Sequence, residues 1–390
     1  MGATKMQIPA VAGLAFFSFT TAITVRLAWA EAVALEDSAP SLRLAVALET
    51  RGIGGVDVRR LERLAELDPS SARADFAAAL AANPRSSSAW IATGLDLEQA
   101  GDTSAAEQAL LEATRIDRRF LPAWTAANFY FRRRHEPAFW RWARRTAELT
   151  YDDLRPLLKL SDAFEPDPRR VVERLGDGKP IARAYLDYLI GQNRLPEAGC
   201  VAQRLLAPPF ADEARLANLT GRHLQAGDAG AALKLWNGFA GPLDPVHGPV
   251  LTNGELRSAP SGEAFDWTVS PAPGISPKWL PGEIAFHFSG AGTESATLLE
   301  QTIPNGQSGY RLRFEYQTSG ISTRFGARWA LNQRESPPLA PSPGWSAGHF
   351  DFRTRASGLA RLQLLYRRDP GTTRPEGTLR MRHLTLDIDP

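Results

Sequence analysis

Two tryptophans, Trp90 and Trp124, lie 34 residues apart in a stretch of Ala- and Leu-rich helical patterns with short Gly, Asp, Asn and Pro breaks. Self-similarity at such a period is typical of stacked helical units, because one helix pair cannot bury its apolar face alone. Neighbouring pairs then stack to form a continuous core. The spacing therefore predicts an α-solenoid, which we place at residues 31–240.

The residues after Trp90 alternate small and large side chains at fixed intervals: Gly94, Leu97, Ala106, Leu110 and Ala113. This pattern resembles the tetratricopeptide repeat (TPR), although Thr93 replaces its Leu and Arg118 stands at the position of its Pro. Weaker matches before and after suggest about five or six repeats. The resemblance implies a concave groove that holds a peptide or protein partner.

A stretch rich in cations and aromatic rings interrupts the repeat pattern. Its candidate binding residues are Arg132, Arg133, Arg134, Arg141, Trp142, Arg144 and Arg145. Guanidinium groups and rings together can hold an anionic glycan or a lipid headgroup by charge and stacking. The alternative is a solvated helix face whose aromatic side chains belong to the core.

The N-terminal segment from Met6 to Val25 carries no charge. Its length of about 20 residues is what a bilayer-spanning helix requires. Two interpretations compete for residues 6–30: an uncleaved membrane anchor, and a signal peptide cleaved after Ala28-Trp29-Ala30. Arg26 lies between the apolar run and that site and favours the anchor. We therefore expect a single membrane-spanning helix in this segment.

Composition changes at residues 241–249, where Gly and Pro break the helical pattern and predict a linker. Beyond it, residues 250–390 show period-two alternation, as in Leu312, Phe314 and Tyr316. Several such runs separated by turns predict an antiparallel β-sandwich of about eight short strands. A change of phase near Arg382–His383 predicts a β-bulge. The expected fold is thus multidomain: a transmembrane helix, an α-solenoid, then a sandwich.

Two segments of this half, Thr252-Asn253-Gly254-Glu255-Leu256 and Phe265-Asp266-Trp267, resemble carbohydrate-binding jelly rolls of the galactose-binding-like type. The resemblance implies glycan binding. The candidate stacking residues are Trp279, Trp345, Trp267 and Tyr366, of which we expect the first two in exposed loops. Arg257 stands where that family often has an acidic calcium ligand, and a guanidinium offers no oxygen. We therefore expect no metal there, despite Glu255 and Asp387 nearby in the pattern.

The sequence contains no familiar catalytic or nucleotide-binding motif, so we expect no cofactor and no enzymatic activity. The 45 basic and 43 acidic residues leave a net charge of +2, which argues against a dedicated nucleic-acid partner. The pairing of repeats with such a sandwich resembles envelope proteins of exopolysaccharide loci. The resemblance implies a single-pass scaffold of the bacterial inner membrane, with its folded part outside the cytoplasm. Such a scaffold would bind envelope proteins through its groove and polysaccharide through its sandwich. The alternatives are a secreted glycan-binding protein and a cryptic glycoside-active enzyme.

Overall fold

The computed structural model describes residues 8–50, 57–68, 70–150, 153–176, 178–206, 212–307, 309–321, 325–355 and 358–388. Of residues 8–20, 50, 58 and 62 it describes the backbone only. The chain divides into two compact units, Met1–Asp177 and Gly178–Pro390.

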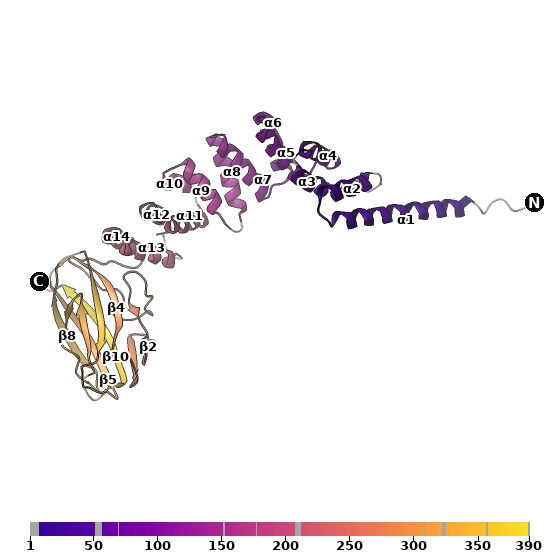
Figure 1. Cartoon of the computed structure of the whole chain (residues 1–390). Coiled ribbons are helices and arrows are strands. Elements are labelled where there is room, and N and C mark those ends of the chain that lie inside the picture. Colours follow the sequence, from indigo (N-terminus) through magenta and orange to yellow (C-terminus); the bar gives the residue numbers. More distant parts are fainter. Residues whose placement is uncertain are drawn as a thin grey trace, which may run out of the picture. The chain divides into compact units, whose positions relative to one another are not determined.

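The first unit is helical (Figure 1). Its helices are α1 (Ile8–Ala34), α2 (Ala39–Thr50), α3 (Val58–Leu67), α4 (Ala72–Ala82), α5 (Ser87–Gln99), α6 (Thr103–Ile116), α7 (Phe120–Arg132), α8 (Glu136–Leu149), α9 (Arg155–Phe164) and α10 (Pro168–Leu175). Side-chain caps fix several helix starts. Ser86 accepts a hydrogen bond from the Ala89 N–H at α5, and Asp102 accepts one from Ala105 at α6.

Consecutive helices pack as pairs, α3 with α4, α5 with α6, and α7 with α8. The small residues of the pattern lie inside these pairs. Gly94 faces Leu110, and Ala106 and Ala113 are fully buried. Small side chains allow the close helix approach that the repeat pattern predicts, so the structure confirms repeat-like helices. Trp90 is only half-buried, and its indole N–H donates to the Pro84 carbonyl over 2.9 Å.

The predicted membrane anchor, residues 6–30, lies partly outside the described residues, because side chains are described only from residue 21 onward. Among the residues that the structure does describe, none of the helices combines the length and the apolar character needed to cross a bilayer.

The second unit begins with the helices α11 (Lys179–Gly191), α12 (Leu195–Ala202), η1 (Gln203–Leu205), α13 (Glu213–Gln225) and α14 (Ala229–Asn237). Its strands are β1 (Thr268–Val269), β2 (Ile275–Leu280), β3 (Glu283–Ser289), β4 (Ser295–Asn305), β5 (Gly309–Ser319), β6 (Ala327–Leu331), β7 (Arg334–Glu335), β8 (Ser346–Arg353), β9 (Gly358–Arg367) and β10 (Glu376–Ile388). The described strands form two antiparallel sheets, ordered β1-β4-β9-β6-β7 and β2-β3-β10-β5-β8. The predicted order of helices followed by an antiparallel β-sandwich is confirmed.

Alternation along the strands places one side of each sheet in a shared core. Leu312 and Phe314 are buried between the sheets, while Arg313 projects outward from the same strand. The β10–β5 register shifts between Arg382 and Thr385, and His383 has a φ of 51°. The predicted bulge is therefore confirmed. It keeps Leu379, Met381, Leu384 and Leu386 on the core side despite their change of phase.

The helical end of the second unit packs directly on the sandwich. Trp236 of α14 makes an edge contact with Phe265, with ring centroids 5.8 Å apart. Leu243 is buried beside them, and Asn237 exchanges two hydrogen bonds with its backbone, of 2.8 and 2.9 Å. The predicted linker, residues 241–249, thus lies inside the second compact unit.

Candidate functional site

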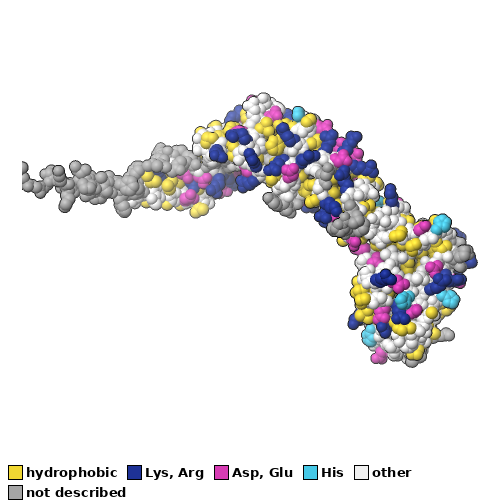
Figure 2. Space-filling view, turned by 180° about the vertical axis from the view of Figure 1, so that it is seen from behind, with side chains coloured by type: hydrophobic (Ala, Val, Ile, Leu, Met, Phe, Trp, Pro, Cys, Tyr) yellow, Lys and Arg dark blue, Asp and Glu magenta, His cyan; other side chains and the backbone are white. Residues whose placement is uncertain are grey.

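A pocket of about 380 Å³ lies where the end of α6, the α6–α7 loop and α8 meet in the first unit. Five of its lining side chains carry guanidinium groups and two carry carboxylates, an excess of three positive charges. The lining residues are Thr114, Asp117, Arg118, Arg119, Ala123, Arg141, Trp142, Arg144, Arg145 and Glu148. Basic side chains are also frequent on the visible face of the helical repeats (Figure 2).

Two of these arginines are neutralised within the pocket. Arg119 pairs with Asp117 at 2.9 Å, and Arg145 pairs with Glu148 at 3.0 Å. The hydrogen bond from Arg119 is the main cause that holds the pKa of Asp117 below its ordinary value. Asp117 is therefore ionised at neutral pH and keeps Arg119 in place.

A third arginine, Arg144, has a structural partner. It donates to the backbone carbonyls of Arg174 and Glu173 at the end of α10, over 3.0 and 3.1 Å. Terminal carbonyls of a helix lack intrahelical donors, so a cation there satisfies them. Arg144 consequently links two helices of the repeat unit.

The last two guanidinium groups, of Arg118 and Arg141, form no ion pair with any carboxylate of the described residues. Arg141 lies beside the Trp142 ring, with its Cζ 5.4 Å from the ring centroid. The indole Nε1 of Trp142 is shielded from solvent and has no hydrogen-bond partner in the described structure. The pocket thus combines two uncompensated cations with an aromatic side chain.

The other members of the predicted basic-aromatic patch lie elsewhere. Arg132 and Arg133 both pair with Glu98 of α5. Arg134 lies over the rings of Phe131 and Phe164, at 5.6 and 5.7 Å from their centroids. The structure therefore divides the patch: Arg141, Trp142, Arg144 and Arg145 share one pocket, and the first three arginines serve other contacts.

Two pocket residues, Arg118 and Arg119, were not among the predicted site residues. They stand in the α6–α7 loop, where the repeat pattern has a proline at position 118. That departure was visible in the sequence and could have drawn attention to the loop. The sequence does not show how the helices stack, and therefore it could not reveal that this loop lies close to α8.

Two of the four predicted glycan-stacking residues are buried in the sandwich core. Trp267 is fully buried and donates its indole N–H to the Asn253 carbonyl over 3.2 Å. Tyr366 is 2% exposed and packs against Phe288, and burial raises the pKa of its hydroxyl. Neither ring presents a face to solvent, so both expectations need correction. The register of strand β9 turns Tyr366 inward, whereas Trp267 directly precedes β1 and joins the sandwich core beside Trp329.

The other two candidates are half-buried. Trp279 lies on strand β2, not in a loop as expected, and its indole N–H donates to the Leu256 carbonyl over 3.0 Å. Trp345 precedes β8, and two guanidinium groups lie over its ring: Cζ of Arg382 at 4.0 Å and of Arg380 at 5.2 Å from the centroid. These cations occupy part of the surface that a sugar would need for stacking.

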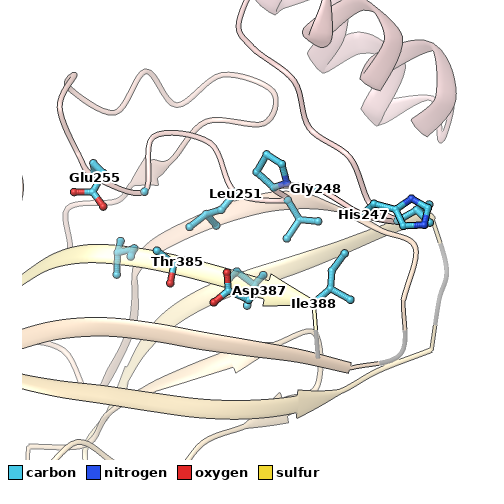
Figure 3. A pocket seen from close by; sticks show the side chains of 13 residues that line it. His247, Gly248, Leu251, Glu255, Thr385, Asp387 and Ile388 are labelled. Atoms are coloured by element: carbon cyan, nitrogen blue, oxygen red, sulfur yellow. The ribbon is translucent and has the colours of Figure 1, made fainter. Parts of the chain in front are cut away.

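A further pocket of about 500 Å³ lies between the segment 246–255 and the end of β10 (Figure 3). Two acidic side chains, Glu255 and Asp387, line it. Glu255 contacts the Nδ1 atom of His383 at 2.8 Å, and Asp387 forms an ion pair with Arg313. In the described part of the chain, no group of three or more His, Cys, Asp or Glu residues is placed to hold a metal ion.

Comparison with known proteins gives weak likenesses. No protein-family model and no curated protein matches the chain. YrrB, "a TPR protein with an unusual peptide-binding site", is 14% identical, and the match covers 42% of this chain and 89% of that one, with a TM-score of 0.22. PilF of Pseudomonas aeruginosa is 15% identical over 55% of this chain and 86% of its own, with a TM-score of 0.21.

The secreted serine protease VesC from Vibrio cholerae is 12% identical, with a TM-score of 0.24. That match covers 36% of this chain but only 28% of the protease. All three TM-scores are below 0.5, so these likenesses assign no partner and no activity to the chain.

Proposed function

We propose that this protein is a non-catalytic scaffold whose helical repeats bind an acidic segment of a partner protein. The observation that carries the proposal is the pocket of α6, α7 and α8, where Arg118 and Arg141 have no carboxylate partner among the described residues. A guanidinium binds a carboxylate through two parallel hydrogen bonds, and such charge-assisted pairs are stronger than neutral ones.

The pocket also has the mixed character of a peptide-binding site. Its volume of about 380 Å³ falls within the usual range for ligand sites. Trp142 offers an aromatic surface, and rings and arginines dominate the energy of protein interfaces. Arg119 and Arg145, each paired with its own carboxylate, line the same pocket as Arg118 and Arg141.

The test uses the full-length protein and a fluorescent peptide rich in Asp and Glu, with binding followed by anisotropy. The variant Arg118→Gln/Arg141→Gln should bind at least tenfold more weakly. The control is Arg59→Gln/Arg85→Gln, which removes the same charge from exposed positions outside the pocket. An equal loss in both variants would show unspecific attraction and would contradict the proposal.

Membrane attachment is the second part of the proposal. The uncharged segment Met6–Val25 supports an anchor in the inner membrane, with the folded part outside the cytoplasm. Membrane association that persists in high salt is the expected result. A mature chain that begins at Glu31, found by N-terminal sequencing, would favour the secreted alternative instead.

Participation in envelope polysaccharide assembly or export, with the sandwich binding glycan, completes the proposal. Its support is the sandwich fold and the half-buried ring of Trp279, since two guanidinium groups lie over the ring of Trp345. Binding of the full chain to a glycan array would test it, and turnover of a labelled oligosaccharide would replace it with the enzyme alternative.

A further inference from the structure

A third pocket, of about 880 Å³, lies on the β-sandwich where the β6–β7 turn, the end of β8 and strand β9 meet. It contains four arginines and no acidic residue. The lining residues are Leu331, Asn332, Gln333, Arg334, Arg353, Thr354, Arg355, Arg361 and Gln363. None of these residues is among the four candidate stacking residues Trp279, Trp345, Trp267 and Tyr366.

The four guanidinium groups of Arg334, Arg353, Arg355 and Arg361 form no ion pair within the described residues. This is unusual for the sandwich, where most arginines have a carboxylate partner. On the same sheet, for example, Glu335 pairs with both Arg328 and Arg367. Four like charges in one pocket repel one another, and an anionic ligand would relieve that repulsion.

The backbone of the pocket is held in place by two asparagines. Asn332, in the β6–β7 turn with a φ of 54°, donates its N–H to the Arg361 carbonyl over 2.8 Å and accepts from the Arg361 N–H over 2.9 Å. Asn305, buried on β4, donates its side-chain amide to the Arg355 carbonyl over 2.7 Å. The arginines therefore project from fixed segments.

We infer that this pocket binds a polysaccharide that carries carboxylate groups. The guanidinium groups match the carboxylates, and Gln333, Gln363 and Thr354 supply amide and hydroxyl groups for sugar hydroxyls. A peptide would need an apolar anchor, but the one apolar lining residue, Leu331, is fully buried. The site is distinct from the rings of Trp279 and Trp345.

This inference deepens the glycan-binding part of the proposed function and is independent of its protein-binding part. The experiment titrates the full-length protein with an oligogalacturonate by calorimetry, next to an uncharged maltooligosaccharide of the same length. Only the acidic oligosaccharide should bind, and its affinity should fall as salt is added, because exposed charges are screened.

Two exposed arginines on one face of strand β9, Arg361 and Arg367, provide a matched pair of variants. Arg361→Gln removes an unpaired cation of the pocket, whereas Arg367→Gln removes the same charge from a residue held by Glu335. Arg361→Gln should weaken binding about tenfold, and Arg367→Gln by less than about twofold. Thermal unfolding of both variants verifies that the fold is kept.

Three outcomes would overturn the inference. The first is that the acidic oligosaccharide does not bind at low salt, and the second is that Arg361→Gln and Arg367→Gln lose the same affinity for it. The third is that polyglutamate binds to this pocket more tightly than the oligogalacturonate does. The last outcome would leave the acidic-peptide proposal for the helical repeats standing, provided that Arg118→Gln/Arg141→Gln still weakens peptide binding. Failure of the repeat pocket in that assay would leave the present inference untouched.

Discussion

A β-carbon at Gly94 would lie 2.7 Å from both the Cγ and Cδ2 atoms of Leu110, the residue that faces it across the α5–α6 pair. Leu110 is buried and cannot turn away freely. Gly94→Val should therefore destabilise the repeat unit by about 1–3 kcal/mol, the usual cost of overpacking. Thermal or denaturant unfolding measures the change.

The control for this substitution is Gly221 in the interior of α13, where an added β-carbon would meet no atom within 4 Å. Gly221→Ala should stabilise the protein by up to about 1 kcal/mol, because alanine favours the helix. If Gly94→Val unfolds like the parent protein, the α5–α6 packing described above is wrong.

Asp212 accepts hydrogen bonds from Arg183 of α11, the shorter over 2.7 Å, and its side chain is 1% exposed. The bond from Arg183 is the first cause that lowers the pKa of Asp212. A lowered folded-state pKa stabilises the protein above the unfolded-state pKa, and this stabilisation disappears as pH falls through the folded-state value.

Asp212→Asn should accordingly lower the unfolding temperature at pH 7. The difference from the parent protein should shrink as pH falls below about 4, the ordinary range of an aspartate. Unfolding temperatures of both proteins between pH 7 and pH 3 test this. A constant difference across that range would show that Asp212 acts by packing and not by its charge.

The Trp236–Phe265 contact predicts how the second unit tolerates truncation. A fragment of residues 248–390 loses Trp236 and Leu243, which bury Phe265. Exposing such a ring costs about 1.5–3 kcal/mol, so this fragment should melt below a fragment of residues 178–390. Trp236→Ala in the longer fragment should reproduce most of the loss. Identical melting of the two fragments would mean that the sandwich folds independently of α14.

Substitution of Trp345 distinguishes a packing role of its ring from a ligand-binding role. Arg382 and Arg380 lie over its ring, so Trp345→Ala should cost about 0.5–1 kcal/mol of stability through lost cation–π contacts. If the ring serves only these arginines, the variant should bind glycan as the parent does. A large loss of glycan affinity with little loss of stability would restore Trp345 as a stacking platform.

Much of the fold was predictable, because its signals are local. The spacing of Trp90 and Trp124 identified the repeat, since each helix pair needs the same small residues at the same places. The alternation in β5 and the change of phase near His383 predicted a strand and a bulge, since side chains alternate with a period of two. The half-buried state of Trp90 was not predicted, because spacing does not state how deeply a ring is covered.

The candidate sites were less predictable. The sequence by itself determined which residue types were available: arginines in a repeat that normally has a proline at position 118, and tryptophans among strands. Only the tertiary structure decided that Arg118 and Arg141 line one pocket and that Trp267 is buried. It also decided that Arg361 shares a pocket with three other arginines that form no ion pair among the described residues. These residues come from different helices, strands and loops, and their proximity depends on helix stacking and strand register. Both are set by packing between segments distant in sequence, which local patterns do not encode.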